Sequence, residues 1–143
     1  MKHDPTLQRF LDAQATDYPV ALAEIRRGYK QSHWMWYIFP QIQGLGFSSF
    51  AQYYAIRDRQ EAGAYAQHEV LGPRLVEISE VLLALPSTDA NDILGSPDDL
   101  KLRSCMTLFA ALPGANPVFQ AVLQKFFQGR PDERTLQILA RTS

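Results

Sequence analysis

The sequence predicts an all-α protein, a compact multihelical single domain over 1–143 with about eight or nine short helices and not a simple bundle. Three observations support this prediction. Strand signals are almost absent, because β-branched residues nowhere alternate with polar residues over five or more positions. Residues that start and stop helices are frequent along the chain. The length of 143 residues and the 46% of hydrophobic residues suit one hydrophobic core.

Two helices are expected before Gly28. Asp4 as the capping residue and Pro5 in the first turn start the first helix, and apolar residues then follow at helical spacing. A new start signal at Pro19 predicts a second helix. Two cationic residues followed by Gly28 end this helix, because cations favour the carboxyl end and glycine accepts positive φ.

A short aromatic helix is expected next, with Ser32 as its capping residue, and Pro40 prevents it from continuing beyond Phe39. The later helices each have a start or stop signal. One helix is capped by Ser48 or Ser49 and contains Ile56, and the next extends from Arg59 to about Gln67. Three more are expected at 70–85 with Pro73 in the first turn, at 89–94 ended by Gly95, and at 97–112. A further helix begins at Asn116 and Pro117 and is closed by Gly129, and Asp132 caps the last one.

Composition excludes several classes of function. Fourteen Lys and Arg against 15 Asp and Glu leave a formal charge of −1, so no basic excess attracts duplex DNA or an anionic membrane. The longest apolar runs, Trp34–Phe39 and Val81–Leu85, are far shorter than the ~18 residues of a membrane span. No apolar signal segment follows the first residues. We therefore expect a cytoplasmic protein with no membrane partner and no duplex nucleic acid partner.

No metal and no cofactor are expected. The three histidines, His3, His33 and His68, have no partner at metal-ligand spacing, and Cys105 is the one cysteine. Cys105 cannot form an internal disulfide. It lies on an apolar stripe, which favours a small buried side chain over a nucleophile.

The segment from Ser32 to Gln41 is the first candidate for function, because it holds both tryptophans of the chain. A helix of this composition is apolar on all sides, so Trp34, Met35 and Phe39 are expected in the core. For His33 and Trp36, burial and a role in binding remain open. Indole and imidazole rings near cationic residues are typical of a pocket that stacks a planar ring.

The segment from Lys101 to Phe109 is the second candidate. Met106 and Phe109 belong to an apolar stripe, whereas Arg103, Ser104 and Thr107 form a polar strip inside an otherwise apolar helix. One interpretation is internal, with Arg103 paired to a carboxylate and the hydroxyls bonded one turn back. The other is a ligand site, in which the guanidinium or Lys101 binds phosphate and the hydroxyls bind ribose.

With both segments in view, the sequence resembles a bacterial family of unknown function whose members are often mislabelled "calpastatin". The resemblance implies a compact multihelical domain unrelated to the eukaryotic protease inhibitor. Cys105 stands where the family pattern has serine. The segments that carry the resemblance are Lys30 with Ser32–Trp36, Phe39–Gln41, Gly44–Gly46, Tyr54–Ile56, His68 with Val70–Leu75, and Lys101–Ser104 with Met106–Phe109.

A weaker similarity, in helical order and in the region 106–127, links this family to the ADP-ribose-related NADAR superfamily of glycosidases. This similarity implies a nucleotide-like or ADP-ribose-like ligand and N-glycosidic hydrolysis. The alternative is a non-enzymatic protein-interaction module whose aromatic motif is purely core. The sequence identifies no catalytic residue, does not decide whether the protein is an enzyme and predicts no oligomeric state.

Two structural expectations separate these functions. Because both candidate segments have more apolar surface than one contact can bury, we expect them to lie against each other. If the chain binds a ligand, the binding residues should converge on one concave site. The candidate ligand-binding residues are His33, Trp36, Lys101, Arg103, Ser104 and Thr107.

Overall fold

The computed structural model describes residues 5–142, and within this range it contains helices and no strands, which confirms the all-α prediction. A short 3₁₀ helix, η1 (Pro5–Leu7), opens the described range. The α-helices are α1 (Gln8–Arg26), α2 (Met35–Ile38), α3 (Ser49–Tyr53), α4 (Arg59–Gln67), α5 (Leu71–Ala84), α6 (Ala90–Leu94), α7 (Asp98–Ala110), α8 (Pro117–Phe127) and α9 (Glu133–Thr142).

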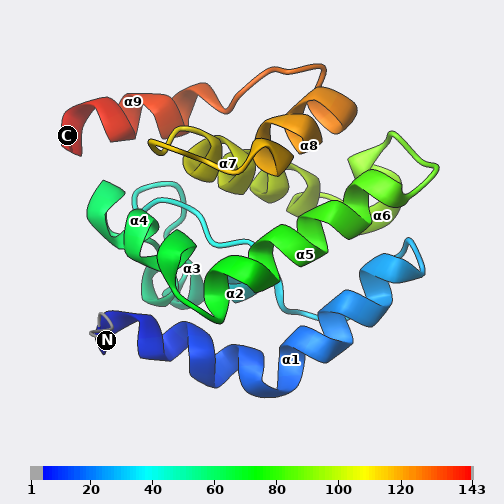
Figure 1. Ribbon diagram of the computed structural model, residues 1–143, viewed down its shortest axis with the longest axis horizontal. Helices are drawn as coiled ribbons and strands as arrows, with labels where there is room; N and C mark the ends of the chain where they lie inside the picture. Colours follow the sequence, from blue (N-terminus) through cyan, green and yellow to red (C-terminus); the bar gives the residue numbers. More distant parts are fainter. Residues whose placement is uncertain (1–4, 143) are drawn as a thin grey trace.

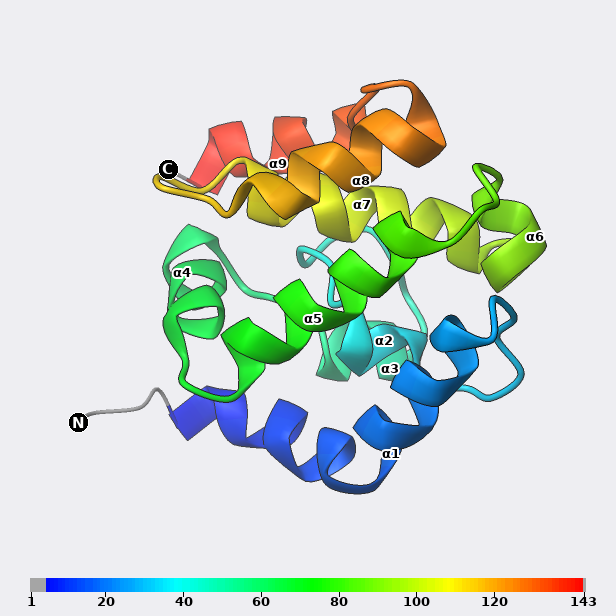
Figure 2. The same ribbon diagram turned by 45° about the vertical axis from the view of Figure 1, so that its right-hand side comes forward.

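Helix α5 crosses the middle of the molecule, with α1 on one side and α7, α8 and α9 on the other (Figures 1 and 2). It packs against α1, α4 and α8, and α7 in turn packs against α6, α8 and α9. The short helices α2 and α3 lie beside α1 (Figure 2). The arrangement therefore has two helical groups joined through one central helix.

The core is formed by the apolar sides of these helices. Phe39, Met106 and Phe109 are inaccessible to solvent, and Trp34 and Met35 are 1% and 3% exposed. These five side chains were expected in the core, and the structure confirms this expectation. Cys105 is also fully buried, and its burial raises the pKa of the thiol.

Most helix ends follow the predicted signals. The side chains of Ser48, Asp58, Asp89 and Asn116 accept hydrogen bonds from backbone N–H groups at the starts of α3, α4, α6 and α8. Gly28 follows α1 and has a φ of 79°, which suits glycine. The expected cap at Asp4 and the residue His3 lie outside the described residues.

The prediction of two helices before Gly28 is wrong. Helix α1 continues through Pro19, which lies inside it, and the helix bends along its length (Figure 1). Tyr18 and Ala21, on either side of Pro19, are buried in the core, whereas Pro19 itself is exposed. Burial of the continuous apolar face outweighs the loss of one helical hydrogen bond.

The aromatic helix is shorter than predicted. Helix α2 is a single turn from Met35 to Ile38, and Ser32 does not cap it. Instead the Ser32 hydroxyl donates a 2.5 Å hydrogen bond to Glu24 of α1. The residues before α2 thus form an irregular connection, because a buried carboxylate competes for the groups that would otherwise cap a helix.

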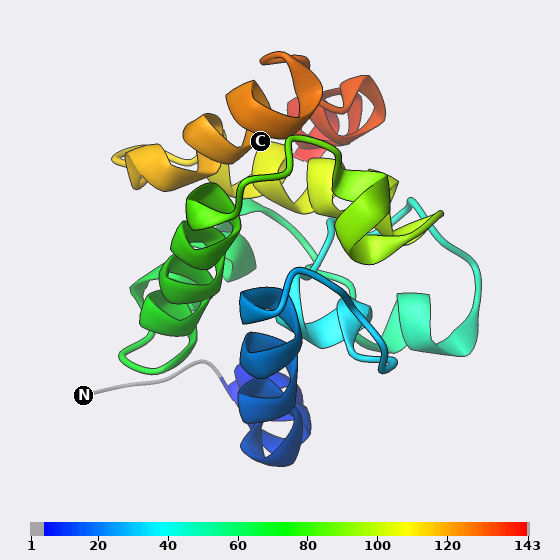
Figure 3. The ribbon, with the colours of Figure 1, turned by 90° about the vertical axis from the view of Figure 1, so that its right-hand side faces the viewer.

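The segment 43–55, which we call the α3 excursion, leaves and rejoins the fold at one place. Ile42 and Ile56 form an isolated parallel bridge. The N–H of Gln43 donates to the carbonyl of Ile56 at 2.7 Å, and the N–H of Ile56 donates to the carbonyl of Gln41 at 2.8 Å. Figure 3 shows this segment at the margin of the molecule.

Candidate functional site

A small cavity lies between α2, the start of α7 and the residue before α9. Its volume is about 220 Å³, and we call it the Trp36 cleft. It is lined by Trp36, Gln41, Leu45, Gly46, Pro97, Leu100, Lys101, Ser104 and Asp132. The cleft therefore contains three of the six residues that the sequence singled out for binding, namely Trp36, Lys101 and Ser104.

The two candidate segments meet at Trp36 and Lys101. The Nζ atom of Lys101 lies 3.9 Å from the centroid of the Trp36 ring, a cation–π contact that confirms the expected proximity of the segments. The indole ring is partly buried. Because the ammonium covers one face of the ring, a planar ligand cannot stack on that face while Lys101 stays in place.

Lys101 belongs to an ion network that joins α7 to the connection before α2. Asp98 accepts hydrogen bonds from Lys30 at 2.9 Å and from Lys101 at 3.0 Å. Burial alone would raise the pKa of Asp98, but its hydrogen bonds to the two ammonium groups hold the pKa below the usual value. Two cations share one carboxylate, so this network carries a net charge of +1, and Lys101 is its member that lines the cleft.

The opposite edge of the cleft has a hydroxyl and a carboxylate. The Ser104 hydroxyl lies 3.1 Å from Oδ2 of Asp132 and 3.2 Å from the carbonyl oxygen of Leu100, two acceptors for its one proton. Oδ2 of Asp132 also accepts hydrogen bonds from the N–H and the hydroxyl of Thr135 at the start of α9. Asp132 is therefore held in one orientation from two sides.

Gln41 contributes an unsatisfied polar atom to the lining. Its Nε2 is buried and has no hydrogen-bond partner among the described residues. Buried amide groups nearly always have a partner, so each exception requires an explanation. A ligand with an acceptor group in the cleft would supply the missing hydrogen bond.

His33 and Arg103 do not line the cleft. His33 is exposed, and only its carbonyl has a described contact, as a 3.3 Å acceptor for the Tyr37 hydroxyl. The guanidinium of Arg103 donates to the carbonyls of Arg130 and Pro131, at 3.0 and 2.8 Å. The structure therefore does not bring His33 and Arg103 together with Trp36 at this cleft. Backbone carbonyls hold Nε and Nη2 of Arg103 away from the cavity, and the side chain of His33 faces solvent.

Thr107 is also absent from the lining, and its contacts hold the chain before α9. Its hydroxyl donates to the carbonyl of Arg103 at 2.8 Å and accepts from the N–H of Asp132 at 2.9 Å. Thr107 is 2% exposed. Thr107 and Arg103 therefore position Asp132 at the cleft without facing the cavity themselves.

Gln41 and Asp132 line the cleft although no sequence pattern marked them as site residues. Asp132 was interpreted only as a helix cap, which it is, but it also lines the cleft. The polar strip at Ser104 and Thr107 was the available signal, because two hydroxyls in an apolar helix require polar partners. The sequence did not show which segment provides those partners.

Part of the aromatic segment has a structural role centred on Glu24, which is 4% exposed. Its carboxylate accepts hydrogen bonds from the N–H groups of Gln31 and Ser32, the Ser32 hydroxyl and the indole N–H of Trp34. Burial alone would raise the pKa of Glu24, but these hydrogen bonds lower it to about 2. Ser32 and Trp34 thus anchor the segment, and Trp36 faces the cleft.

The described residues contain neither a metal-binding cluster nor a membrane-spanning helix. No group of three or more His, Cys, Asp or Glu side chains between residues 5 and 142 is arranged to hold a metal ion. No helix in the same range is long and apolar enough to span a membrane.

Comparisons with known proteins place the chain in a family. A family model described as "Protein of unknown function (DUF1810)" matches residues 4–139. The conserved hypothetical protein Rv1873 from Mycobacterium tuberculosis, known from a crystal structure, is 47% identical in sequence to this chain, and the two structures superpose with a TM-score of 0.93. The match covers 96% of this chain and 99% of the mycobacterial chain. No curated protein matches the sequence. The expected membership of a family of unknown function is thus confirmed, and the chain belongs to the DUF1810 family.

Proposed function

We propose that the chain binds a nucleotide-like ligand of the ADP-ribose type, with a ribose in the Trp36 cleft. The observation that carries this proposal is the convergence of an indole, an ammonium, a hydroxyl and a carboxylate on one cavity, from Trp36, Lys101, Ser104 and Asp132. Ribose hydroxyls are both donors and acceptors, so they suit a lining of this mixed kind. The resemblance to the NADAR superfamily supports the same ligand class.

The size of the cleft limits which part of the ligand it can hold. Its 220 Å³ is below the roughly 300 to 1,000 Å³ of sites that enclose a whole drug-sized molecule. One sugar fits this volume and a dinucleotide does not. In this proposal the ribose occupies the cleft, a phosphate lies near the excess positive charge of Lys30 and Lys101, and the rest of the ligand lies on the surface.

The proposal includes hydrolysis of the N-glycosidic bond of that ribose. As the bond between the anomeric carbon and nitrogen breaks, positive charge develops on the sugar, and a nearby carboxylate stabilises it. A carboxylate can also accept a proton from the attacking water, whose oxygen bonds to the anomeric carbon. The base leaves with the electron pair of the broken bond, and the nicotinamide of NAD then departs as a neutral molecule. Asp132 is the one carboxylate among the nine lining residues, so we assign it this role.

Binding is tested by thermal unfolding with ADP-ribose, NAD and AMP. A ligand at ~100 times its dissociation constant stabilises the folded state by about 2.7 kcal/mol, which gives a measurable rise in melting temperature. Lys101→Met should remove most of this rise. Arg134→Met, which removes an exposed cation from α9, should leave it unchanged. If none of the three nucleotides raises the melting temperature of the parent chain, the binding proposal is wrong.

Hydrolysis is tested by chromatography of nucleotide incubations, with Asp132→Asn as the variant. Asparagine has the same shape but cannot act as a base, so the rate of base release should fall by about two orders of magnitude or more. Asp89→Asn is the matched control, because Asp89 also caps a helix and lies outside the cleft. Equal rates for the two variants would exclude Asp132 as the catalytic carboxylate.

One observation favours the alternative of a non-enzymatic interaction module. Phe47, Phe50 and Tyr53 of the α3 excursion are 84%, 62% and 59% exposed, and exposed aromatic groups of this kind are typical of protein contacts. The alternative predicts no thermal shift with any nucleotide. It also predicts concentration-dependent sedimentation that is lost in the double variant Phe47→Ser, Phe50→Ser.

A further inference from the structure

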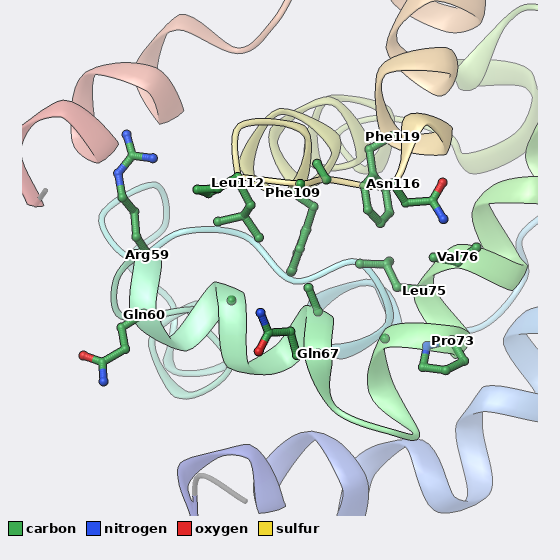
Figure 4. Close-up of a pocket in the computed structure, with 16 residues that line it drawn as sticks. Arg59, Gln60, Gln67, Pro73, Leu75, Val76, Phe109, Leu112, Asn116 and Phe119 are labelled. Atoms are coloured by element: carbon green, nitrogen blue, oxygen red, sulfur yellow. The ribbon is translucent and has the colours of Figure 1, made fainter.

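A second and larger cavity lies along α4, and we call it the α4 cavity. Its volume is about 780 Å³, and it shares no lining residue with the Trp36 cleft. Figure 4 shows it between α4, α5 and the connection from α7 to α8. The lining consists of Arg59, Gln60, Gly63, Ala66, Gln67, Gly72, Pro73, Leu75, Val76, Phe109, Leu112, Pro113, Gly114, Ala115, Asn116 and Phe119.

The lining is mainly apolar and includes one charged side chain. Pro73 and Val76 of α5 and Leu112 of the α7–α8 connection supply apolar surface to the cavity, and the buried Phe109 points from α7 toward α4 in Figure 4. Arg59, at the start of α4, stands at one end of the cavity. A volume within the roughly 300 to 1,000 Å³ of ligand sites, with many apolar groups and few polar ones, is typical of a small-molecule site.

One nitrogen of the Arg59 guanidinium lacks a partner among the described residues, although the residue as a whole is only partly buried. Its Nε is buried and unbonded, and no ion pair joins Arg59 to a carboxylate of the described residues. Glu61, two residues further along α4, is not available to it, because its carboxylate accepts hydrogen bonds from Thr6 and Arg9 and pairs with Arg57. A buried donor without a partner is costly, so an external anion is the expected partner.

The other helix starts beside the cavity do not compete for an anion. At the start of α5, the N–H groups of Val70 and Leu71 donate to Nδ1 of His68 at 3.0 and 3.2 Å. At the start of α8, the N–H of Val118 donates to the side chain of Asn116 at 2.9 Å. An anionic group is therefore attracted to the Arg59 end, and the rest of the ligand extends along the apolar wall.

Gly63 keeps the middle of the cavity open. It lies inside α4, and a Cβ atom at this position would have no neighbour within 4 Å. Packing therefore does not require glycine here, although glycine weakens a helix interior. A longer side chain at this position would point into empty space that the cavity provides. From Arg59 to Gln67, α4 rises by about 12 Å, which sets the length of an apolar group that fits beside it.

We infer that the α4 cavity binds an amphipathic carboxylic acid. The carboxylate pairs with the Arg59 guanidinium, and an aliphatic or aromatic body of up to about 12 Å lies along α4 against Pro73, Val76 and Leu112. This inference is independent of the function proposed for the Trp36 cleft.

The test is calorimetric titration with octanoate as the probe and 1-octanol as its neutral counterpart. Octanoate should bind at least about tenfold more tightly than 1-octanol, because only the acid pairs with Arg59. Arg59→Gln should weaken octanoate binding about tenfold or more. Gly63→Leu should abolish it by placing a side chain across the middle of the cavity, whereas Gly63→Ala, which adds one methyl group, should retain it.

Three results would overturn the inference: no octanoate binding to the parent chain, equal binding of octanoate and 1-octanol, or octanoate binding that neither Arg59→Gln nor Gly63→Leu changes. Circular dichroism melting checks that each variant is folded. The thermal shift with ADP-ribose should be the same in the parent, Arg59→Gln and Gly63→Leu. The outcomes at the two cavities can therefore be distinguished.

Discussion

At the scale of single residues, Glu24 makes the clearest contribution to stability. Its carboxylate is buried and accepts hydrogen bonds from backbone, hydroxyl and indole donors, so its pKa is about 2 in the folded chain. In the unfolded chain the value returns to about 4.5. A folded pKa below the unfolded value contributes stability that is present above pH ~4.5 and is lost as the pH falls towards about 2.

We expect Glu24→Gln to lower the free energy of unfolding at pH 7 by about 3 kcal/mol, the equivalent of this pKa difference. The variant should also lose stability less steeply than the parent between pH 4.5 and 2.5. Urea unfolding at pH 7, 4 and 3 measures both effects. Parallel stability curves for the two proteins across this pH range would contradict the account.

The candidate site was only partly predictable at this scale. Trp36, Lys101 and Ser104 were identified from sequence, because polar residues within an apolar helix and a second tryptophan in one short segment are not typical of a purely apolar core. Gln41 and Asp132 could not be assigned to the site. No local pattern shows that the chain returns to Ser104 28 residues later, where the Asp132 carboxylate accepts a hydrogen bond from the Ser104 hydroxyl. Arg103 lies outside the cleft and donates to backbone carbonyls, an arrangement that has no signal in sequence.

At the scale of elements, Arg103 ties α7 to the connection between α8 and α9. We expect Arg103→Lys to lower the free energy of unfolding by about 1–2 kcal/mol, because one ammonium cannot reproduce both hydrogen bonds to the carbonyls. The ADP-ribose thermal shift should persist, since Arg103 does not line the cleft. Chemical unfolding and the thermal shift assay test the two statements, and loss of the shift at unchanged stability would restore Arg103 as a ligand contact.

Alanine substitutions at Gly63 in α4 and Gly72 in α5 should change the free energy of unfolding in opposite directions. A Cβ at Gly63 meets nothing, so Gly63→Ala should raise the free energy of unfolding by about 0.5–1 kcal/mol. A Cβ at Gly72 would lie 2.2 Å from the carbonyl oxygen of Ala66. Gly72→Ala should therefore lower the free energy of unfolding by about 2 kcal/mol, because the added methyl group forces α4 and α5 apart. Urea unfolding of both variants is the measurement, and a change of the same sign in both would show that the helices adjust freely.

Helix ends were predictable where a side chain caps the backbone, as at Ser48 and Asp58. They were not predictable where contacts with residues far away in the sequence determine the position of the helix end. Pro19 is a sound start signal by local rules, yet the apolar face on both sides of it keeps α1 continuous. The length of α2 was overestimated for a similar reason, because Glu24, ten residues before Trp34, binds the groups that precede the helix.

At the scale of the whole molecule, local stability should be uneven. Helices α5 and α7 supply many fully buried side chains, among them Leu82 and Phe109, whereas the α3 excursion exposes Phe47 and Phe50. Segments with few buried contacts open most readily. Hydrogen exchange followed by mass spectrometry should therefore show peptides from 43–55 exchanging well before those from α5 and α7. Equal protection of these segments would contradict this expectation.

The backbone clamp that joins Ile42 to Ile56 has an evolutionary consequence. Because the clamp consists of backbone N–H and carbonyl groups, it does not depend on which side chains lie between its ends. Residues 47–53, which lie between the family segments Gly44–Gly46 and Tyr54–Ile56, can therefore change in length or composition while the helical core stays unchanged. Leu45 and Gly46 lie in the segment and form one wall of the Trp36 cleft. A change in this stretch of chain can thus reshape one wall of the Trp36 cleft without a new fold.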